Sequence, residues 1–260
     1  MKHKLCIAYD GGGYSGWQIQ PNAPSIQEEL EKALSLLCKE QVRVIGSGRT
    51  DQGAHALAQV AHFTSGITPP LLALNGVLPP DIRVKTLEIV PDSFHAQYSA
   101  TGKIYHYHIW LERIADPFIR RYRYHFPYPL SMELVEEASS LFVGRHDFKT
   151  FANVGSNVKS TTRHLKKIDV VPQEGGFRLE FEGEGFLYKM VRNIVGTLLE
   201  VATHKRPLED ILELFAKKDR RLAGTCAPAH ALFLMQVFYG ASSNEEMCAK
   251  SHSSASLAIS

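Results

Sequence analysis

The sequence predicts an α+β fold of two similar halves that share a mixed, largely antiparallel central sheet, with helices on one face and a cleft between the halves. Strand and helix patterns run in nearly the same order in each half. The 260-residue, 44% hydrophobic chain is also near the size at which single cores divide. We expect residues 1–99 to form the N-terminal half, residues 100–240 the C-terminal half, and the Ser/Ala-rich residues 241–260 a disordered tail.

The first half alternates strands with two helices. Ser25 and Glu28 form a capping box, and apolar residues recur at helical spacing behind it, which predicts an amphipathic helix packed on a sheet. A short helix opens after Pro70, and Gly76 with Pro79–Pro80 should end it. The predicted strands are Lys4–Tyr9, Gln41–Ile45, Ala58–Phe63 and Asp81–Val90.

The second half repeats this order without a detectable residue-level repeat. A helix begins at Met132 behind Ser131, Leu187–Thr203 is the longest predicted helix, and a last helix begins at Pro207. The predicted strands are Ile104–Trp110, Leu165–Val171, Phe177–Phe181 and Leu232–Tyr239.

A glycine-rich loop follows the first strand. Gly11, Gly13 and Gly16 have the spacing of the dinucleotide-binding fingerprint. That motif requires a helix directly behind it, whereas residues 17–24 contain Pro21 and Pro24 and cannot form one. We therefore do not predict a nucleotide site here.

The chain is organised around a second glycine-rich loop, at residues 46–56. It carries Arg49 and Asp51 two positions apart, with glycines on both sides and no apolar residue that would bury the charged groups. Such a loop presents a reactive carboxylate to a ligand. The alternative is a tight turn in which the aspartate bonds its own backbone.

Histidines near this loop raise the question of a metal site. His55 and His62 lie four and eleven residues after Asp51, across a loop and a strand, and this spacing does not promise convergent ligands. Two hydrogen-bonded histidines are the favoured interpretation. The four cysteines are scattered without zinc-binding spacing, so we expect no metal.

Three further features are candidates for substrate binding. Tyr105 lies in a strand with rings on both faces, as either a packing residue or a platform for a base. Arg120, Arg121 and Arg123 alternate with aromatic residues, a pattern that suits weak RNA contacts and equally a solvated loop pinned by rings. Arg192 falls outside the apolar stripe of its helix, so periodicity predicts a solvated boundary residue.

The central loop resembles a known signature. Gly48–His55, read as GRTDQGAH, is similar to the GRTD-x-G-x-H motif of the tRNA pseudouridine synthase A (TruA) family. Gln52 and His230–Ala231 depart from the family's usual residues without touching a charged group, which leaves only local backbone geometry open. Four other segments resemble the same family in the same order: Ala8–Gly11 with Gly16–Gln18, Phe94–Ala96 running to Tyr105–Tyr107, Met190–Gly196, and Thr225–Ala229.

The resemblance implies the pseudouridine synthase fold and the isomerisation of uridine to pseudouridine in the anticodon stem-loop of tRNA, at positions 38, 39 and 40. It implies that Asp51 is catalytic, and that Arg49 fills the space left by the flipped base or holds a phosphate. Tyr105 would stack on the uracil, and Arg192 would pair with Asp51 and keep it ionised. Such a reaction requires no cofactor. A homodimer that binds tRNA across both subunits is also implied.

Composition restricts the remaining possibilities. The formal charge of +2 gives no global case for nucleic-acid binding, so any RNA contact must come from local patches. The absence of a long apolar run predicts a soluble, cytoplasmic protein without membrane contact. Two other functions stay open: an RNA chaperone that leaves uridine unmodified, and a base-excising hydrolase, which would need a second carboxylic acid to activate water.

Overall fold

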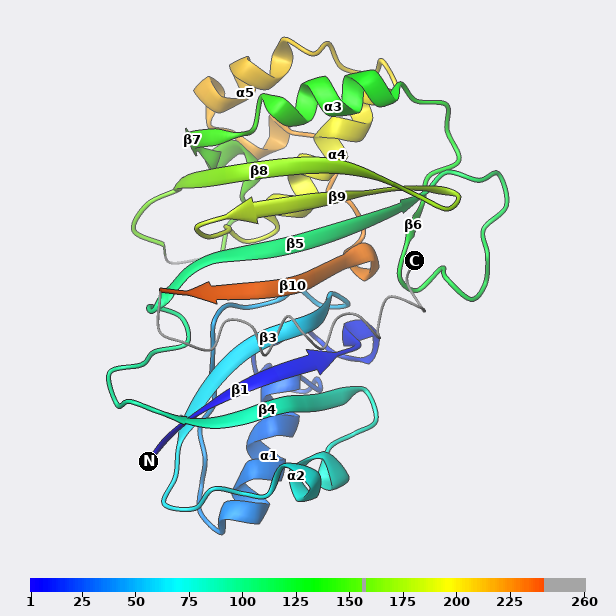
Figure 1. Ribbon diagram of the computed structural model, residues 1–260. Coiled ribbons are helices and arrows are strands. Elements are labelled where there is room, and N and C mark those ends of the chain that lie inside the picture. Colours follow the sequence, from blue (N-terminus) through cyan, green and yellow to red (C-terminus); the bar gives the residue numbers. More distant parts are fainter. Residues whose placement is uncertain (156–157, 241–260) are drawn as a thin grey trace. The chain divides into compact units, whose positions relative to one another are not determined.

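The computed structural model describes residues 1–155 and 158–240, so the tail predicted at 241–260 lies outside the described residues. The chain divides into two compact units. The first contains Met1–Thr101 and the closing strand from Phe233, and the second contains Gly102–Leu232. Each unit combines helices with a largely antiparallel sheet, which confirms the predicted α+β class (Figure 1).

The sheet of the first unit is built around β1 (Lys2–Tyr9). This strand pairs in antiparallel fashion with β3 (His55–Thr64) on one side and β4 (Ile82–Val90) on the other. The closing strand β10 (Leu232–Tyr239) pairs with β3 in parallel, so the sheet is mixed as predicted. The two-residue strand β2 (Ile45–Gly46) pairs antiparallel with β3.

Two helices accompany this sheet. α1 (Ile26–Cys38) begins at the predicted cap, where the Ser25 hydroxyl accepts a hydrogen bond from the Glu28 N–H at 3.3 Å. In Figure 1, α1 lies behind the strands of the sheet. α2 (Leu71–Val77) packs against β4 and α1. Gly76 lies inside α2, and the helix ends before the predicted prolines, because Leu78 precedes Pro79 and is extended.

Residues 41–44 do not form the predicted strand. Val42 and Val44 are buried, as their alternation suggested. The N–H of Val42, however, donates to Ser35 Oγ, and the N–H of Val44 donates to Glu31 Oε1, each at 2.9 Å. Because side chains of α1 satisfy these backbone groups, only Ile45 and Gly46 join the sheet.

The strands of the second unit follow the order β5, β9, β8, β7, with antiparallel pairing between neighbours. A two-residue strand, β6, pairs in parallel with β5. The strand bounds are β5 Ala100–Trp110, β6 Tyr124–His125, β7 Gly144–Asp147, β8 Thr162–Gln173 and β9 Gly176–Gly183.

Three helices complete the second unit: α3 (Met132–Ser140), α4 (Met190–Ala202) and α5 (Asp210–Lys217). α3 packs against α4 and β8. α4 begins three residues later than predicted and is buried around most of its circumference, so its apolar face is wider than a single stripe. Within the described residues, no helix is long and apolar enough to cross a membrane.

Candidate active site

The central loop occupies residues 47–54, between β2 and β3. A turn closes inside it, because the N–H of Ala54 donates to the carbonyl oxygen of Asp51 at 3.1 Å. Arg49 is exposed and Asp51 is half-buried. The loop therefore holds its acidic residue at the first position of a closed turn, next to a cation that faces solvent.

The loop that follows β1, at residues 10–17, packs against the central loop. The N–H of Trp17 donates to the carbonyl oxygen of Thr50 at 3.2 Å. A Cβ at Gly16 would lie 2.6 Å from that same oxygen, and Gly16 has φ +89°. A Cβ at Gly11 would lie 1.9 Å from the carbonyl oxygen of Ala54. Two glycines of the apparent dinucleotide fingerprint thus allow two loops to touch.

The two histidines of this region are held by both backbone and side-chain groups. His55 Nδ1 lies 3.0 Å from Asp10 Oδ1 and 3.1 Å from the N–H of Gly11, and the ring stacks on Phe233. His62 Nδ1 accepts from the N–H of Ala96 at 3.1 Å. Burial, with the nearby charges of His95 and Lys2, lowers the pKa of His62 to about 4.

No group of three or more potential metal ligands occurs among residues 1–155 and 158–240. His55 and His62 instead serve the packing of β3 and its neighbours, through the hydrogen bonds described above.

The second unit places Tyr105 and Arg192 in a buried environment. Tyr105, on β5, is 8% exposed and packs edge-to-face against Phe186 with ring centroids 4.9 Å apart. Arg192, on α4, is half-buried, and its Nε donates to the carbonyl oxygen of Ala227 at 2.6 Å. The N–H of Ala227 donates back to the carbonyl oxygen of Arg192 at 3.1 Å. Arg192 thus lies at the boundary of the apolar stripe, as periodicity predicted, but its guanidinium is hydrogen-bonded to the protein.

The segment around Ala227 is a meeting point for other residues. Tyr107 is fully buried, and its hydroxyl donates to the carbonyl oxygen of Pro228 at 2.9 Å. A Cβ at Gly196 would lie 1.6 Å from the carbonyl oxygen of Thr225, so α4 can approach this segment only with glycine there. Three separate parts of the second unit that resemble the synthase family therefore converge in the structure.

The three candidate arginines of the basic loop have different environments. Arg120 and Arg121 are exposed. Arg123 is only 3% exposed, its guanidinium donates to the carbonyl oxygen of Glu174 at 2.7 Å, and it lies over the ring of Trp110 at 5.4 Å. The prediction that Arg123 contacts RNA is corrected accordingly, because its guanidinium anchors the loop to the β8–β9 hairpin.

Sequence reasoning passed over Lys103. It lies on β5 two positions before Tyr105, and side chains two apart on a strand share a face. Burial lowers the pKa of Lys103 to about 8. The sequence could have indicated this residue, because a lysine two positions before Tyr105 in a predicted strand lies on the same face as Tyr105.

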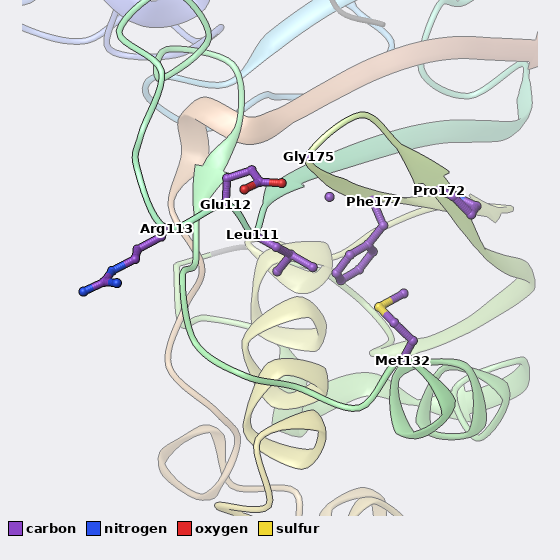
Figure 2. Close-up of a pocket in the computed structure, with 8 residues that line it drawn as sticks. Leu111, Glu112, Arg113, Met132, Pro172, Gly175 and Phe177 are labelled. Carbon is purple, nitrogen blue, oxygen red and sulfur yellow. The ribbon is translucent and has the colours of Figure 1, made fainter.

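A hollow of about 460 Å³ opens elsewhere in the second unit (Figure 2). Figure 2 shows Met132 and Phe177 close together in it and Arg113 pointing away. None of the predicted site residues lines it. Its lining consists of Leu111, Glu112, Arg113, Met132, Pro172, Gly175, Gly176 and Phe177.

Taken by themselves, the fold and the loop define an α+β protein that presents a glycine-flanked carboxylate. The chain matches a family described as tRNA pseudouridine synthase over residues 5–99 and 138–240. Asp51, Arg49 and Arg192 lie inside the matched residues, whereas Tyr105 and the basic loop lie outside them.

Curated relatives agree with this match. The chain is 52% identical to tRNA pseudouridine synthase A 1 of Protochlamydia amoebophila, over 95% of this chain and 98% of the relative. It is 45% identical to tRNA pseudouridine synthase A of Bacillus licheniformis, over 92% and 99%. The identity is 41% with tRNA pseudouridine synthase A of Bacillus subtilis, again over 92% and 99%. The chain therefore belongs to the tRNA pseudouridine synthase family, whose members are isomerases.

A solved structure of a Cbf5–Nop10–Gar1 complex aligns with 90% of this chain and 59% of that chain, with a TM-score of 0.36 and 12% identity. A likeness this weak carries no argument.

Proposed function

We propose that this protein converts uridine to pseudouridine at positions 38, 39 and 40 of the anticodon stem-loop of tRNA, with Asp51 as the catalytic residue. The main support is the presentation of Asp51, half-buried at the first position of a closed turn that a second loop contacts. Such contacts fix the position of a carboxylate, as catalysis requires. The family match is the second support.

The chemistry suits one carboxylate. Breaking the bond between N1 of uracil and C1′ of the ribose develops positive charge on the sugar, and an ionised carboxylate beside C1′ or C2′ stabilises it, as in glycosidases. The freed uracil rotates and forms a bond from C5 to C1′, and the proton on C5 is released while N1 gains one. Atoms balance without a co-substrate, so the reaction is an isomerisation.

Three further roles complete the proposal. The target base must leave its stack, at a cost of a few kcal/mol, and Arg49 occupies the vacated space or binds the adjacent phosphate. Tyr105 stacks on the uracil, and Arg192 keeps Asp51 ionised. The family resemblance supports these roles, together with the burial of Tyr105 and the partial burial of Arg192 in the second unit.

Asp51→Asn tests the central claim. The change is isosteric and removes the charge, so turnover should be abolished while tRNA affinity is largely retained, because phosphate contacts supply most of the affinity. Release of tritium from uridine labelled at C5 measures turnover, and filter binding measures affinity. Near-parental turnover in Asp51→Asn would end the proposal.

Mass spectrometry and chemical mapping of the tRNA after incubation distinguish this reaction from its alternatives. Isomerisation leaves the mass of the RNA unchanged and gives a chemically mappable pseudouridine at positions 38 to 40. Base excision lowers the mass of the RNA. A chaperone leaves the mass unchanged and gives no pseudouridine. Replacing Tyr105 by Phe keeps the ring, so much of the activity should survive if stacking dominates.

We also propose a cytoplasmic homodimer, which light scattering in solution would reveal as twice the 29.0 kDa chain mass.

A further inference from the structure

Four buried polar side chains form a cluster within and beside the central loop, and the mechanism above uses none of them. Tyr9 comes from β1, Ser47 and Thr50 from the loop itself, and Gln59 from β3. Their exposed fractions are 0% for Gln59, 1% for Ser47, 4% for Tyr9 and 8% for Thr50. Burying so many polar groups is costly unless each one is hydrogen-bonded, so their partners show what the cluster does.

The amide of Gln59 is held in one orientation by backbone groups. Its Oε1 lies 3.2 Å from the N–H of Val60, which can only donate. Its Nε2 lies 3.0 Å from the carbonyl oxygen of Gly48, which can only accept. The hydroxyl of Ser47 therefore donates to Oε1, at 2.7 Å. Gln59 thus binds both residues at the start of the loop.

The same amide also contacts Tyr9. Nε2 of Gln59 points its N–H at the hydroxyl oxygen of Tyr9, at a longer 3.5 Å. Burial raises the pKa of Tyr9 well above its usual value, so the phenol stays protonated. The Tyr9 hydroxyl and Oγ1 of Thr50 lie 2.8 Å apart, and either oxygen can donate the hydrogen bond that joins them. A chain of hydrogen bonds thus runs from Gln59 through Tyr9 to the residue before Asp51.

Thr50 is held at a second point as well. Its carbonyl oxygen accepts from Trp17, and the carbonyl oxygen of Asp51 accepts from Ala54. With its side chain bound to Tyr9 and its backbone bound to Trp17, Thr50 has little freedom to rotate. The backbone of Asp51, one residue on, is fixed by the same contacts.

We propose that Gln59 and Tyr9 are positioning residues, which hold the loop so that the Asp51 carboxylate stays at its working position. The inference rests on the proposed function of Asp51. Replacing either residue should lower the catalytic rate without changing tRNA affinity, because neither side chain is exposed enough to touch RNA. A loop displaced by about 1 Å can lower a catalytic rate by about a hundredfold.

Two variants remove the hydrogen bonds with little change in shape: Tyr9→Phe and Gln59→Met. Asn75→Leu is the matched control. The amide of Asn75 also makes three hydrogen bonds to backbone, with Leu71 and twice with Val84, and none to the central loop. Single-turnover rates with enzyme in excess report the chemical step, and filter binding and thermal melting are measured on the same samples.

We expect Tyr9→Phe and Gln59→Met to slow the single-turnover rate by about tenfold or more, with tRNA affinity unchanged within about twofold. Asn75→Leu should lower the melting temperature yet keep the parental rate. Thr50→Ser retains the hydroxyl and should keep the rate, whereas Thr50→Val should match Tyr9→Phe. The double variant Tyr9→Phe/Thr50→Val should be no slower than either single one.

Parental rates in both Tyr9→Phe and Gln59→Met would overturn the inference, as would an equal slowing in Asn75→Leu. If Gln59→Met does not fold, the rates of Tyr9→Phe, Thr50→Ser and Thr50→Val are sufficient to test the inference. Asp51→Asn is measured in parallel: activity in that variant overturns the proposed function, whereas an inactive Asp51→Asn beside fully active Tyr9→Phe overturns only the positioning roles.

Discussion

The contact between the two glycine-rich loops can be tested by adding one methyl group. In Gly11→Ala, the new Cβ would lie 1.9 Å from the carbonyl oxygen of Ala54, whereas such contacts in proteins are at least 3.0 Å. The obstructing atom belongs to the backbone and cannot rotate away. The two loops must therefore separate by more than 1 Å.

This displacement has a calculable consequence, because Ala54 closes the turn that begins at Asp51. We expect the catalytic rate of Gly11→Ala to fall by about tenfold to a hundredfold. Overpacking at a buried contact should also lower the free energy of unfolding by about 1–3 kcal/mol. Tritium release under single-turnover conditions and urea denaturation measure the two quantities.

Gly13→Ala is the control in the same loop. A Cβ at Gly13 would meet no atom within 4 Å, so both its rate and its stability should stay close to those of the parent. Equal rates in Gly11→Ala and Gly13→Ala would refute the idea that the first loop fixes the position of the second.

Two other predictions concern the second unit. Burial lowers the pKa of His108 to about 4, against about 6.5 in an unfolded chain, so the unfolded state gains protons first as the pH falls. The contribution of neutral His108 to stability is complete above pH 6.5 and is lost between about pH 6.5 and 4, by up to roughly 3 kcal/mol. Chemical denaturation across this range should show that the free energy of unfolding falls less in His108→Gln than in the parent. Arg123→Ala should lower the free energy of unfolding by about 2–3 kcal/mol, since it breaks a buried charged hydrogen bond. Arg121→Ala should leave stability unchanged and reduce the salt slope of tRNA binding by somewhat less than one unit; the opposite pattern would show that Arg123 faces the RNA.

The sequence by itself determined the features that depend on near neighbours. The cap at Ser25, the strand Leu232–Tyr239 and the loop that carries Arg49 and Asp51 were all predicted from residues a few positions apart. Capping, alternation and glycine-rich turns act through the local backbone, so a short stretch contains the information needed to recognise them.

Only the tertiary structure decided which of the charged and polar residues are buried, and why. Arg123 binds Glu174, 51 positions away, and Arg192 binds Ala227, 35 positions away. Tyr9 reaches Thr50 across 41 positions. The helical period placed Arg192 at the boundary of its helix but gave no sign of Ala227, because periodicity describes one helix and not what packs against it. Burial is set by partners that are distant along the chain, and those partners are known only once the chain has folded.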